Sequence, residues 1–358
     1  MLIYKQLNIF WFSGTGNAKM VAETMAEKSR EMSIPVFLHN IDNFNEKKPE
    51  VPDQSVSCII SPTHGFNYPP IVLDFILKMP KGRGRSIFLM NTRAGTKLHK
   101  LFLPGASGIA LLLAWLILRI KGYHIVGMRP VDPASNWISL HPGLRDKVVK
   151  SLMKRACHKA ASFAGNMLEG KRKYPALREL PIDLALLPIA IGYYFIGRFM
   201  LAKTFMASWK CNNCGRCIRE CPVKAISQPL KYPYWSYRCE SCMRCMNHCP
   251  RRAIQTIHGF TVFAWWLLLG VAGPAIYLLV FDGLLPTTRS PEWISGSIDF
   301  FILSAISVPL LILSYRLLYL LMHIKPVNWV ISVTSFTFYR FWRRYNAGKA
   351  AEADGFSV

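Results

Sequence analysis

Acidic residues are scarce in this sequence of 358 residues: 20 Asp and Glu stand against 44 Lys and Arg, leaving a formal net charge of +24. Positive charge of this size fits nucleic acid, anionic lipid or an acidic protein as a partner. Hydrophobic residues make up 51% of the chain and include long uncharged runs. Such runs are typical of membrane proteins, so anionic lipid is favoured over the other two partners. Residues 1–5 lack the charged flank, apolar region and cleavage site of a signal peptide.

Several motifs of nucleotide-binding and catalytic sites are also missing. The sequence contains neither a GxGxxG dinucleotide fingerprint nor the Gly-Lys-Ser/Thr of a Walker loop. It offers no nucleophile beside a base and no pair of catalytic acids. We therefore predict no catalytic residue and do not expect direct NAD(P)H oxidation. No aromatic stripe interleaves the charges of the basic run 145–173, so nucleic acid is not expected as a partner.

Cysteine is concentrated in one stretch. Eight of the ten cysteines form two copies of the pattern CxxCxxCxxxCP between residues 211 and 250. Few cysteines remain for a disulfide framework, and a reducing compartment is implied. The duplicated pattern is that of a bacterial ferredoxin that holds two [4Fe–4S] clusters. Structural zinc sites are the alternative, but zinc does not require this duplicated spacing.

In ferredoxins of this kind, three thiolates of one repeat and the fourth thiolate of the other repeat hold each cluster. The predicted ligands of the first cluster are Cys211, Cys214, Cys217 and Cys249. The predicted ligands of the second cluster are Cys239, Cys242, Cys245 and Cys221. A proline follows the last cysteine of each repeat and prevents that cysteine from continuing a helix.

A phosphate-binding loop is predicted near the N-terminus. The apolar run 7–12 indicates a buried strand, and residues 18–32 indicate an amphipathic helix. The loop between them is rich in glycine and hydroxyl groups and consists of Ser13, Gly14, Thr15, Gly16 and Asn17. Backbone N–H groups of a loop that opens a helix point at a bound phosphate.

Further strands at 34–38, 56–60, 86–90 and 123–128, with helices between them, predict an α/β domain with a five-stranded parallel sheet. Ligands of such sheets bind beyond the carboxyl ends of the strands. The loop after the third strand contributes Pro62, Thr63, His64, Gly65, Phe66, Asn67 and Tyr68. The loop after the fourth strand contributes Asn91, Thr92, Arg93, Ala94 and Gly95.

On these three loops the region resembles the flavodoxins, which bind FMN on a sheet of strand order 2-1-3-4-5. The resemblance implies that the loop 13–17 holds the FMN phosphate, with Ala18 where a Thr is usual. It also implies that Tyr68 or His64 faces the isoalloxazine ring and that Arg93 lies near the reduced flavin.

A flavodoxin-like region (1–175) followed by a two-cluster ferredoxin (208–258) resembles the flavodoxin–ferredoxin fusion proteins of anaerobic bacteria and archaea. Segments 105–108, 121–123 and 133–137 add to this resemblance, which covers about residues 1–257.

Two apolar segments have ambiguous sequence signals. Residues 109–118 are apolar on all sides but too short to span a bilayer. They predict a helix that contacts a membrane or a partner helix. The alternative is a helix buried in the core of the domain. The linker 176–207 contains the apolar run 182–200. Crossing the membrane there would separate FMN from the clusters, so we expect this run to lie in or dip into the interface.

Two uncharged runs near the C-terminus, 260–281 and 300–324, predict a transmembrane helical hairpin within 259–325. Arg316 interrupts the second run, near enough to its end to snorkel. The connecting loop 282–299 holds one basic residue, whereas the outer flanks hold several, which predicts a cytoplasmic ferredoxin and a cytoplasmic aromatic and basic tail, 326–358.

These features predict an electron-transfer protein of the cytoplasmic membrane. Electrons would pass from a low-potential donor, such as an acidic ferredoxin, through FMN and two [4Fe–4S] clusters. The acceptor would be quinone or an integral membrane reductase. One alternative is a self-contained ferredoxin:quinone oxidoreductase with a quinone pocket near His323, Arg316 or 182–200. Another is an iron–sulfur redox sensor.

Overall fold

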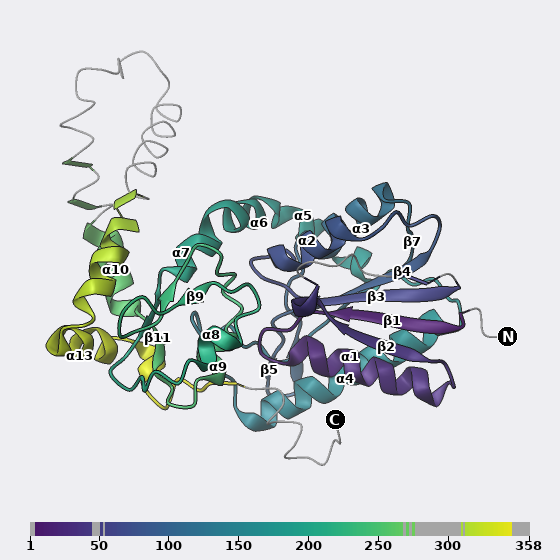
Figure 1. Cartoon of the computed structure of the whole chain (residues 1–358). Coiled ribbons are helices and arrows are strands. Elements are labelled where there is room, and N and C mark those ends of the chain that lie inside the picture. The colour runs from purple at the N-terminus through teal and green to yellow at the C-terminus, as the bar shows by residue number, and fades with distance from the viewer. Residues whose placement is uncertain are drawn as a thin grey trace, which may run out of the picture.

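The computed structural model of the chain describes residues 4–44, 51–52, 54–267, 270–271, 274–275, 309–310 and 312–345. A parallel-sheet domain comes first, a small cysteine-rich domain follows it, and C-terminal helices pack beside the second domain (Figure 1).

The N-terminal sheet has five parallel strands in the spatial order β2-β1-β3-β4-β7. Its strands are β1 (Gln6–Trp11), β2 (Val36–Asn40), β3 (Ser55–Pro62), β4 (Ser86–Thr92) and β7 (His124–Val131). Because β7 is the fifth strand of this sheet along the chain, the order is the 2-1-3-4-5 of flavodoxin-like folds. The predicted α/β sheet and its order are confirmed. Strand β2 starts later than predicted because the N–H of Ile34 still bonds to the end of the preceding helix.

Helices cover both faces of this sheet. Helices α1 (Asn17–Glu31) and α4 (Asp146–Leu168) pack on one face, and α2 (Pro70–Lys78) and α3 (Ala110–Ile120) on the other (Figure 1). Side chains of β1 alternate between two hydrophobic clusters, one on each face of the sheet. Burial on both faces explains why the central strands are almost continuously apolar.

Helix α3 contains most of the apolar segment 109–118. Its inner side, including Leu111 and Leu118, is buried in the core. Its outer side leaves Leu116 48% and Ile120 78% exposed. The segment is therefore a core helix that also presents an apolar outer surface.

A series of short helices leads from the first domain to the second along one edge of the molecule (Figure 1). It consists of η2 (Pro175–Glu179), α5 (Leu180–Ala185), α6 (Leu187–Gly192), η3 (Tyr193–Gly197) and α7 (Arg198–Ala202). Among the described residues no single helix has the length and apolar character to cross a membrane. One bent pair, Pro175–Ala185 and Leu187–Ala202, meets both criteria when taken together, with a 75° bend.

The cysteine-rich domain is built from two similar halves. Two antiparallel strand pairs form it, β8 with β11 and β9 with β10. The elements are β8 (Phe205–Ala207), α8 (Arg216–Arg219), β9 (Ile226–Ser227), β10 (Tyr234–Trp235), α9 (Arg244–His248) and β11 (Ile254–Thr256). Each half contributes one short helix and one of the two CxxCxxCxxxCP motifs.

The C-terminal elements are α10 (His258–Leu267), helix Ile312–Leu321, α13 (Lys325–Val333) and η5 (Phe336–Phe338). Buried Asn328 accepts a hydrogen bond from the Trp209 N–H at 2.8 Å and donates to the Ala207 carbonyl at 3.3 Å. The Arg344 guanidinium donates to the Met246 carbonyl at 2.6 Å. The described part of the predicted tail thus packs on the cysteine-rich domain. Much of the predicted hairpin lies outside the described residues.

Candidate functional site

The structure gathers cysteines of both repeats around one small cavity. This cavity, about 20 Å³, has Cys211, Cys214, Cys217 and Cys249 in its walls, together with Cys245. Burial and repulsion from the thiolates of Cys211, Cys249 and Cys214 raise the pKa of Cys217 to about 11. Cys249, from the second repeat, therefore lies with the first three cysteines of the first repeat.

The remaining cysteines lie together in the same crossed manner. Burial and the neighbouring thiolates of Cys239, Cys242 and Cys221 raise the pKa of Cys245. Burial raises the pKa of Cys242 to about 11, and Cys221 adds to that shift. Thiols grouped in this way ionise readily only when a cation such as iron binds them, and that binding releases their protons.

Both repeats adopt the same backbone conformation. Left-handed φ angles of 57°, 69° and 49° occur at Asn213, Gly215 and Lys224. Equivalent residues of the second repeat have φ angles of 52°, 61° and 49°, at Ser241, Met243 and Arg252. The sharp turns they form place successive cysteines on the same side of each loop.

The last cysteine of each repeat accepts a backbone hydrogen bond at sulfur. The Ala225 N–H donates to Cys221 Sγ at 3.2 Å, and the Ala253 N–H donates to Cys249 Sγ at 3.3 Å. Hydrogen bonds to ligand sulfur are one of the means by which a protein sets the reduction potential of an iron–sulfur cluster. The chemistry of these donors thus fits iron–sulfur ligation.

The second cysteine loop lies directly on the predicted phosphate loop. A Cβ atom added to Gly14 would lie 2.1 Å from the Cys242 carbonyl oxygen, so only glycine allows this approach. The Arg244 guanidinium donates to the carbonyls of Ser13, at 2.7 Å, and Gly14, at 3.3 Å. It also pairs with Asp42 at 2.7 Å. The two domains therefore meet where the phosphate loop and the second cluster site face each other.

The three predicted flavin loops converge on one cavity of about 60 Å³. Its walls include Ser13, Gly14, Thr15, Asn17, Ala18, Pro62, Thr63, His64, Thr92, Arg93 and Ala94. Four buried polar atoms in its walls have no hydrogen-bond partner among the described residues: Asn17 Oδ1, His64 Nδ1, Trp137 Nε1 and Ser241 Oγ. Burial lowers the pKa of His64 to about 4, so its ring is neutral at pH 7. The lining suits a polar ligand.

This cavity has room for a phosphate-sized group but not for a flavin ring. Cavities that enclose small-molecule ligands measure roughly 300–1,000 Å³. The Tyr193 ring occupies the space beside Gly65, 2.0 Å from where a Cβ atom would stand, and packs edge-on against Trp137. The small volume therefore leaves room beside the loop 13–17 for a phosphate-sized group only.

Two residues predicted to contact the flavin have other roles. Tyr68 lies in the core, 1% exposed, and its hydroxyl donates to the Met90 carbonyl at 2.7 Å, so it does not face the cavity. Arg93 reaches the cavity wall, but its guanidinium is bound to Asp132, at 2.6 Å, and to Glu179. Two carboxylates thus already neutralise the charge that was predicted to stabilise the reduced flavin.

Other residues of the predicted loops hold the walls of this cavity in place. The Asn91 amide donates to Thr63 Oγ1 at 2.7 Å and to Ser107 Oγ at 3.1 Å, and so links the loops after β3 and β4. Gly65 and Phe66 have φ angles of 52° and 65° and form the turn after β3. Gly95 lies against the Asp132 carbonyl. Asn91, Gly65, Phe66 and Gly95 therefore support the loops that form the cavity and are not among its lining residues.

Sequence reasoning assigned no role to several residues of this region. Trp137, Ser241 and Met243 line the cavity, and the Tyr193 ring packs against Trp137. Trp137 belongs to the segment 133–137, which supported the family resemblance without a function. The other three belong to the linker and the cysteine loop, and no local pattern places them beside a flavodoxin-like cleft.

Comparison with known proteins agrees with the cysteine geometry. The family model described as a 4Fe-4S dicluster domain matches residues 210–254. No curated protein matches the sequence. Residues 210–254 are therefore a 4Fe-4S dicluster domain, and electron transfer is the role that such a domain supports.

Solved flavodoxin structures are similar to the N-terminal domain. Oxidised flavodoxin 1 from Bacillus cereus has 15% identity and a TM-score of 0.32, over 45% of this chain and 95% of that one. A flavodoxin from the domain Archaea has 14% identity and a TM-score of 0.29, over 45% and 99%. Two-electron reduced Megasphaera elsdenii flavodoxin has 17% identity and a TM-score of 0.27, over 44% and 99%. The strand order, not these overlaps, defines the sheet as flavodoxin-like.

Proposed function

We propose that this chain is a membrane-bound electron carrier that takes electrons from a soluble low-potential donor and delivers them to an acceptor in the membrane. The crossed grouping of the cysteines carries the proposal. Cys211, Cys214, Cys217 and Cys249 would hold one [4Fe–4S] cluster, and Cys239, Cys242, Cys245 and Cys221 the other. Each cluster, when bound, carries one electron.

The two cluster sites differ in their access to solvent, which supports a direction of entry. Around the first site, Asn212, Asn213 and Cys214 are exposed, whereas Cys239 of the second site is buried and Cys242 is half-buried. Exposed cations lie near the first site: Lys210, Arg216, Arg219 and Lys231. A positive, accessible surface favours encounter with an acidic donor protein, such as a soluble ferredoxin. The second, less accessible site would then pass electrons to the acceptor.

Membrane association is proposed from the exposed apolar surface of the linker helices. Ile182, Leu184, Ile189, Phe195 and Ile196 are each more than half exposed. Helix α10 adds Val262, Phe263 and Trp266, with exposures of 70%, 55% and 62%. A contiguous surface of this kind marks a membrane or protein contact. The excess of cations also favours anionic lipid headgroups and a cytoplasmic-membrane location.

The test is the metal content of the full chain, purified anaerobically from mildly solubilised membranes. Two cubanes require about eight irons and about eight sulfides per chain. Reduction with dithionite should give the electron paramagnetic resonance signal of two interacting [4Fe–4S]⁺ clusters. Zinc in place of iron, or iron without acid-labile sulfide, would contradict the proposal.

We also propose FMN as the ligand of the cleft, held by its phosphate at the loop 13–17. The strand order, the phosphate loop and the four unpartnered polar atoms support it. Replacing Tyr193 with Ala frees the space beside Gly65, and we expect FMN to bind at least about tenfold more tightly than to the wild type, or about 1.4 kcal/mol. Quenching of flavin fluorescence measures this affinity.

The matched control is Phe195→Ala, which changes a neighbouring ring that is 67% exposed and lies outside the cleft walls. It should leave FMN affinity unchanged. If neither wild type nor Tyr193→Ala bound FMN, the proposal that the cleft binds FMN would be wrong. The electron-carrier proposal would stand, because it depends on the cysteines alone.

A further inference from the structure

A second cavity, with almost wholly apolar walls, lies between the helices η3 and α7 and the start of the helix Ile312–Leu321. It measures about 320 Å³ and is lined by side chains of η3 and α7 together with Lys203, Tyr237 and Ile312. Its volume lies within the range of roughly 300–1,000 Å³ that is usual for small-molecule sites. Apolar and aromatic walls with very few polar groups are typical of a site for a hydrophobic ring.

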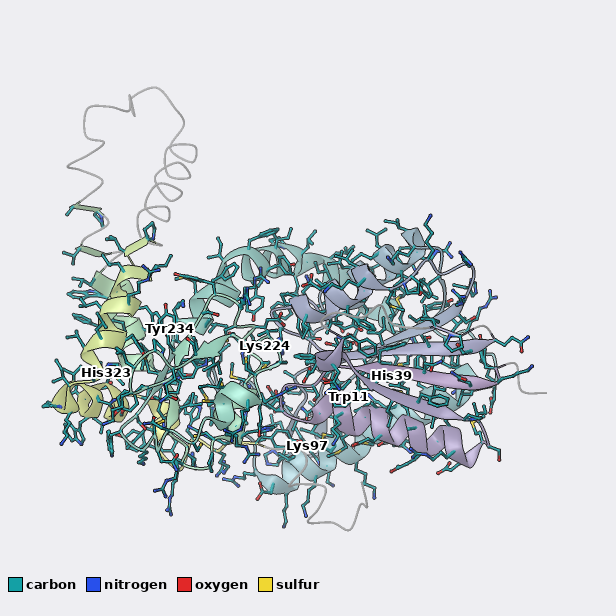
Figure 2. All side chains as sticks on the ribbon, viewed as in Figure 1. Trp11, His39, Lys97, Lys224, Tyr234 and His323 are labelled. Atoms are coloured by element: carbon teal, nitrogen blue, oxygen red, sulfur yellow. The ribbon has the colours of Figure 1, made fainter. Side chains whose placement is uncertain are left out.

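One buried cation marks the polar end of this cavity. The Lys203 side chain, in a residue only 6% exposed, donates to the Trp235 carbonyl at 2.5 Å. Its Nζ lies over the rings of Tyr237, Tyr234 and Tyr315, at 4.1, 4.8 and 4.7 Å from their centroids. No carboxylate of the described residues pairs with it. Figure 2 shows Tyr234 of this ring cluster beside the C-terminal helices. An ammonium group held in this way can donate a hydrogen bond to a carbonyl oxygen of a ligand.

The cavity is next to the second cluster site. Tyr237 precedes Cys239 by two positions, and Trp235, whose carbonyl accepts from Lys203, packs in one core cluster with Cys239. A ligand in the cavity would lie beside the cluster that the proposed function places nearest the acceptor.

The cavity also borders the apolar surface of the linker. Its lining residues Phe195 and Ile196 are 67% and 55% exposed, and both belong to the surface proposed to contact the membrane. A ligand dissolved in the bilayer could reach it without crossing water. Of the three positions predicted for a quinone pocket, the run 182–200 supplies Phe195, Ile196, Phe199 and Met200 to this cavity. His323 and Arg316 are not among its lining residues.

We infer that this cavity binds the headgroup of a membrane quinone, with the Lys203 ammonium donating to one quinone carbonyl. The inference rests on the proposed function and names its acceptor. Two electrons, one from each reduced cluster and originally from the low-potential donor, together with two protons from water, convert the quinone to the quinol. No other bond forms or breaks in this step.

The experiment measures menadione binding to the full chain, anaerobically purified in mild detergent, by equilibrium dialysis. Ile196→Trp places a large ring at the cavity wall from a half-exposed position, where folding should tolerate it. We expect its Kd for menadione to rise at least tenfold. Lys203→Met keeps the aliphatic stem but removes the donor and should also raise the Kd at least tenfold. Ile189→Trp, equally exposed but outside the cavity, is the control and should bind like the wild type.

The outcomes separate this inference from the proposed function. If all variants bound menadione equally, or if the site retained a phospholipid that Ile196→Trp displaced, the quinone site would be overturned. Reoxidation of dithionite-reduced clusters by menadione in that case would leave the electron-carrier proposal intact. Failure to find reducible clusters would instead overturn the proposed function, whatever the binding result. If Lys203→Met bound less iron than the wild type, its menadione affinity could not be interpreted. The affinity of Ile196→Trp would then decide whether the cavity binds quinone.

Discussion

The double variant Cys214→Ala/Cys249→Ala is expected to retain one complete [4Fe–4S] cluster, or about four irons per chain. Both residues line the first cysteine cavity, so both substitutions fall on the same proposed cluster. The other four cysteines remain and can hold the second cluster. Iron and sulfide analysis with electron paramagnetic resonance of the reduced protein would measure the result.

The matched variant is Cys239→Ala/Cys249→Ala, which also removes two cysteines but takes one from each proposed cluster. It should lose both clusters and bind almost no iron. If each repeat instead held its own cluster, the two results would be exchanged, because Cys239 and Cys249 belong to the same repeat. This pair therefore tests the crossed ligand arrangement directly.

Replacing Arg244 with Ala is expected to uncouple the two domains. The partly buried guanidinium joins the second cysteine loop to Ser13, Gly14 and Asp42. Removing one member of a buried charge pair costs about 3–5 kcal/mol. We expect calorimetry of the variant to show two separate unfolding transitions where the wild type shows one, with the cysteine-rich domain unfolding at the lower temperature.

Arg216→Ala provides the control for this prediction. Its pair with Glu220 is partly exposed, with side-chain exposures of 47% and 31%, and such pairs contribute about 0–1 kcal/mol. This variant should unfold like the wild type. A single unchanged transition in Arg244→Ala would show that other contacts hold the domains together.

Local sequence patterns predicted the elements of both domains well. Strand 7–12 and helix 18–32 were placed within one residue at each end, because apolar periodicity and the loop 13–17 define them locally. The duplicated cysteine spacing identified the dicluster domain for the same reason, since all its ligands lie within 40 residues of each other along the chain.

Contacts between distant residues were not predictable in this way. Tyr68 looked like a flavin-facing residue because its loop follows β3, yet its hydroxyl reaches the Met90 carbonyl in the core. Arg93 was expected to lie near the reduced flavin, yet Glu179, from the linker, pairs with it. Such partners cannot be predicted from the local sequence, because a side chain's position depends on the packing of elements far away along the chain.

By itself, the sequence determined the class of each domain and the eight candidate cluster ligands, because local periodicity and spacing encode them. The expected strand order came from the resemblance to the flavodoxins. Only the tertiary structure decided how the domains meet. It placed the second cysteine loop on Gly14, left about 60 Å³ in the flavin cleft and opened about 320 Å³ beside Lys203. The physical reason is that cavity volumes are what remains after side chains from several separate segments have packed, and no single segment specifies that remainder.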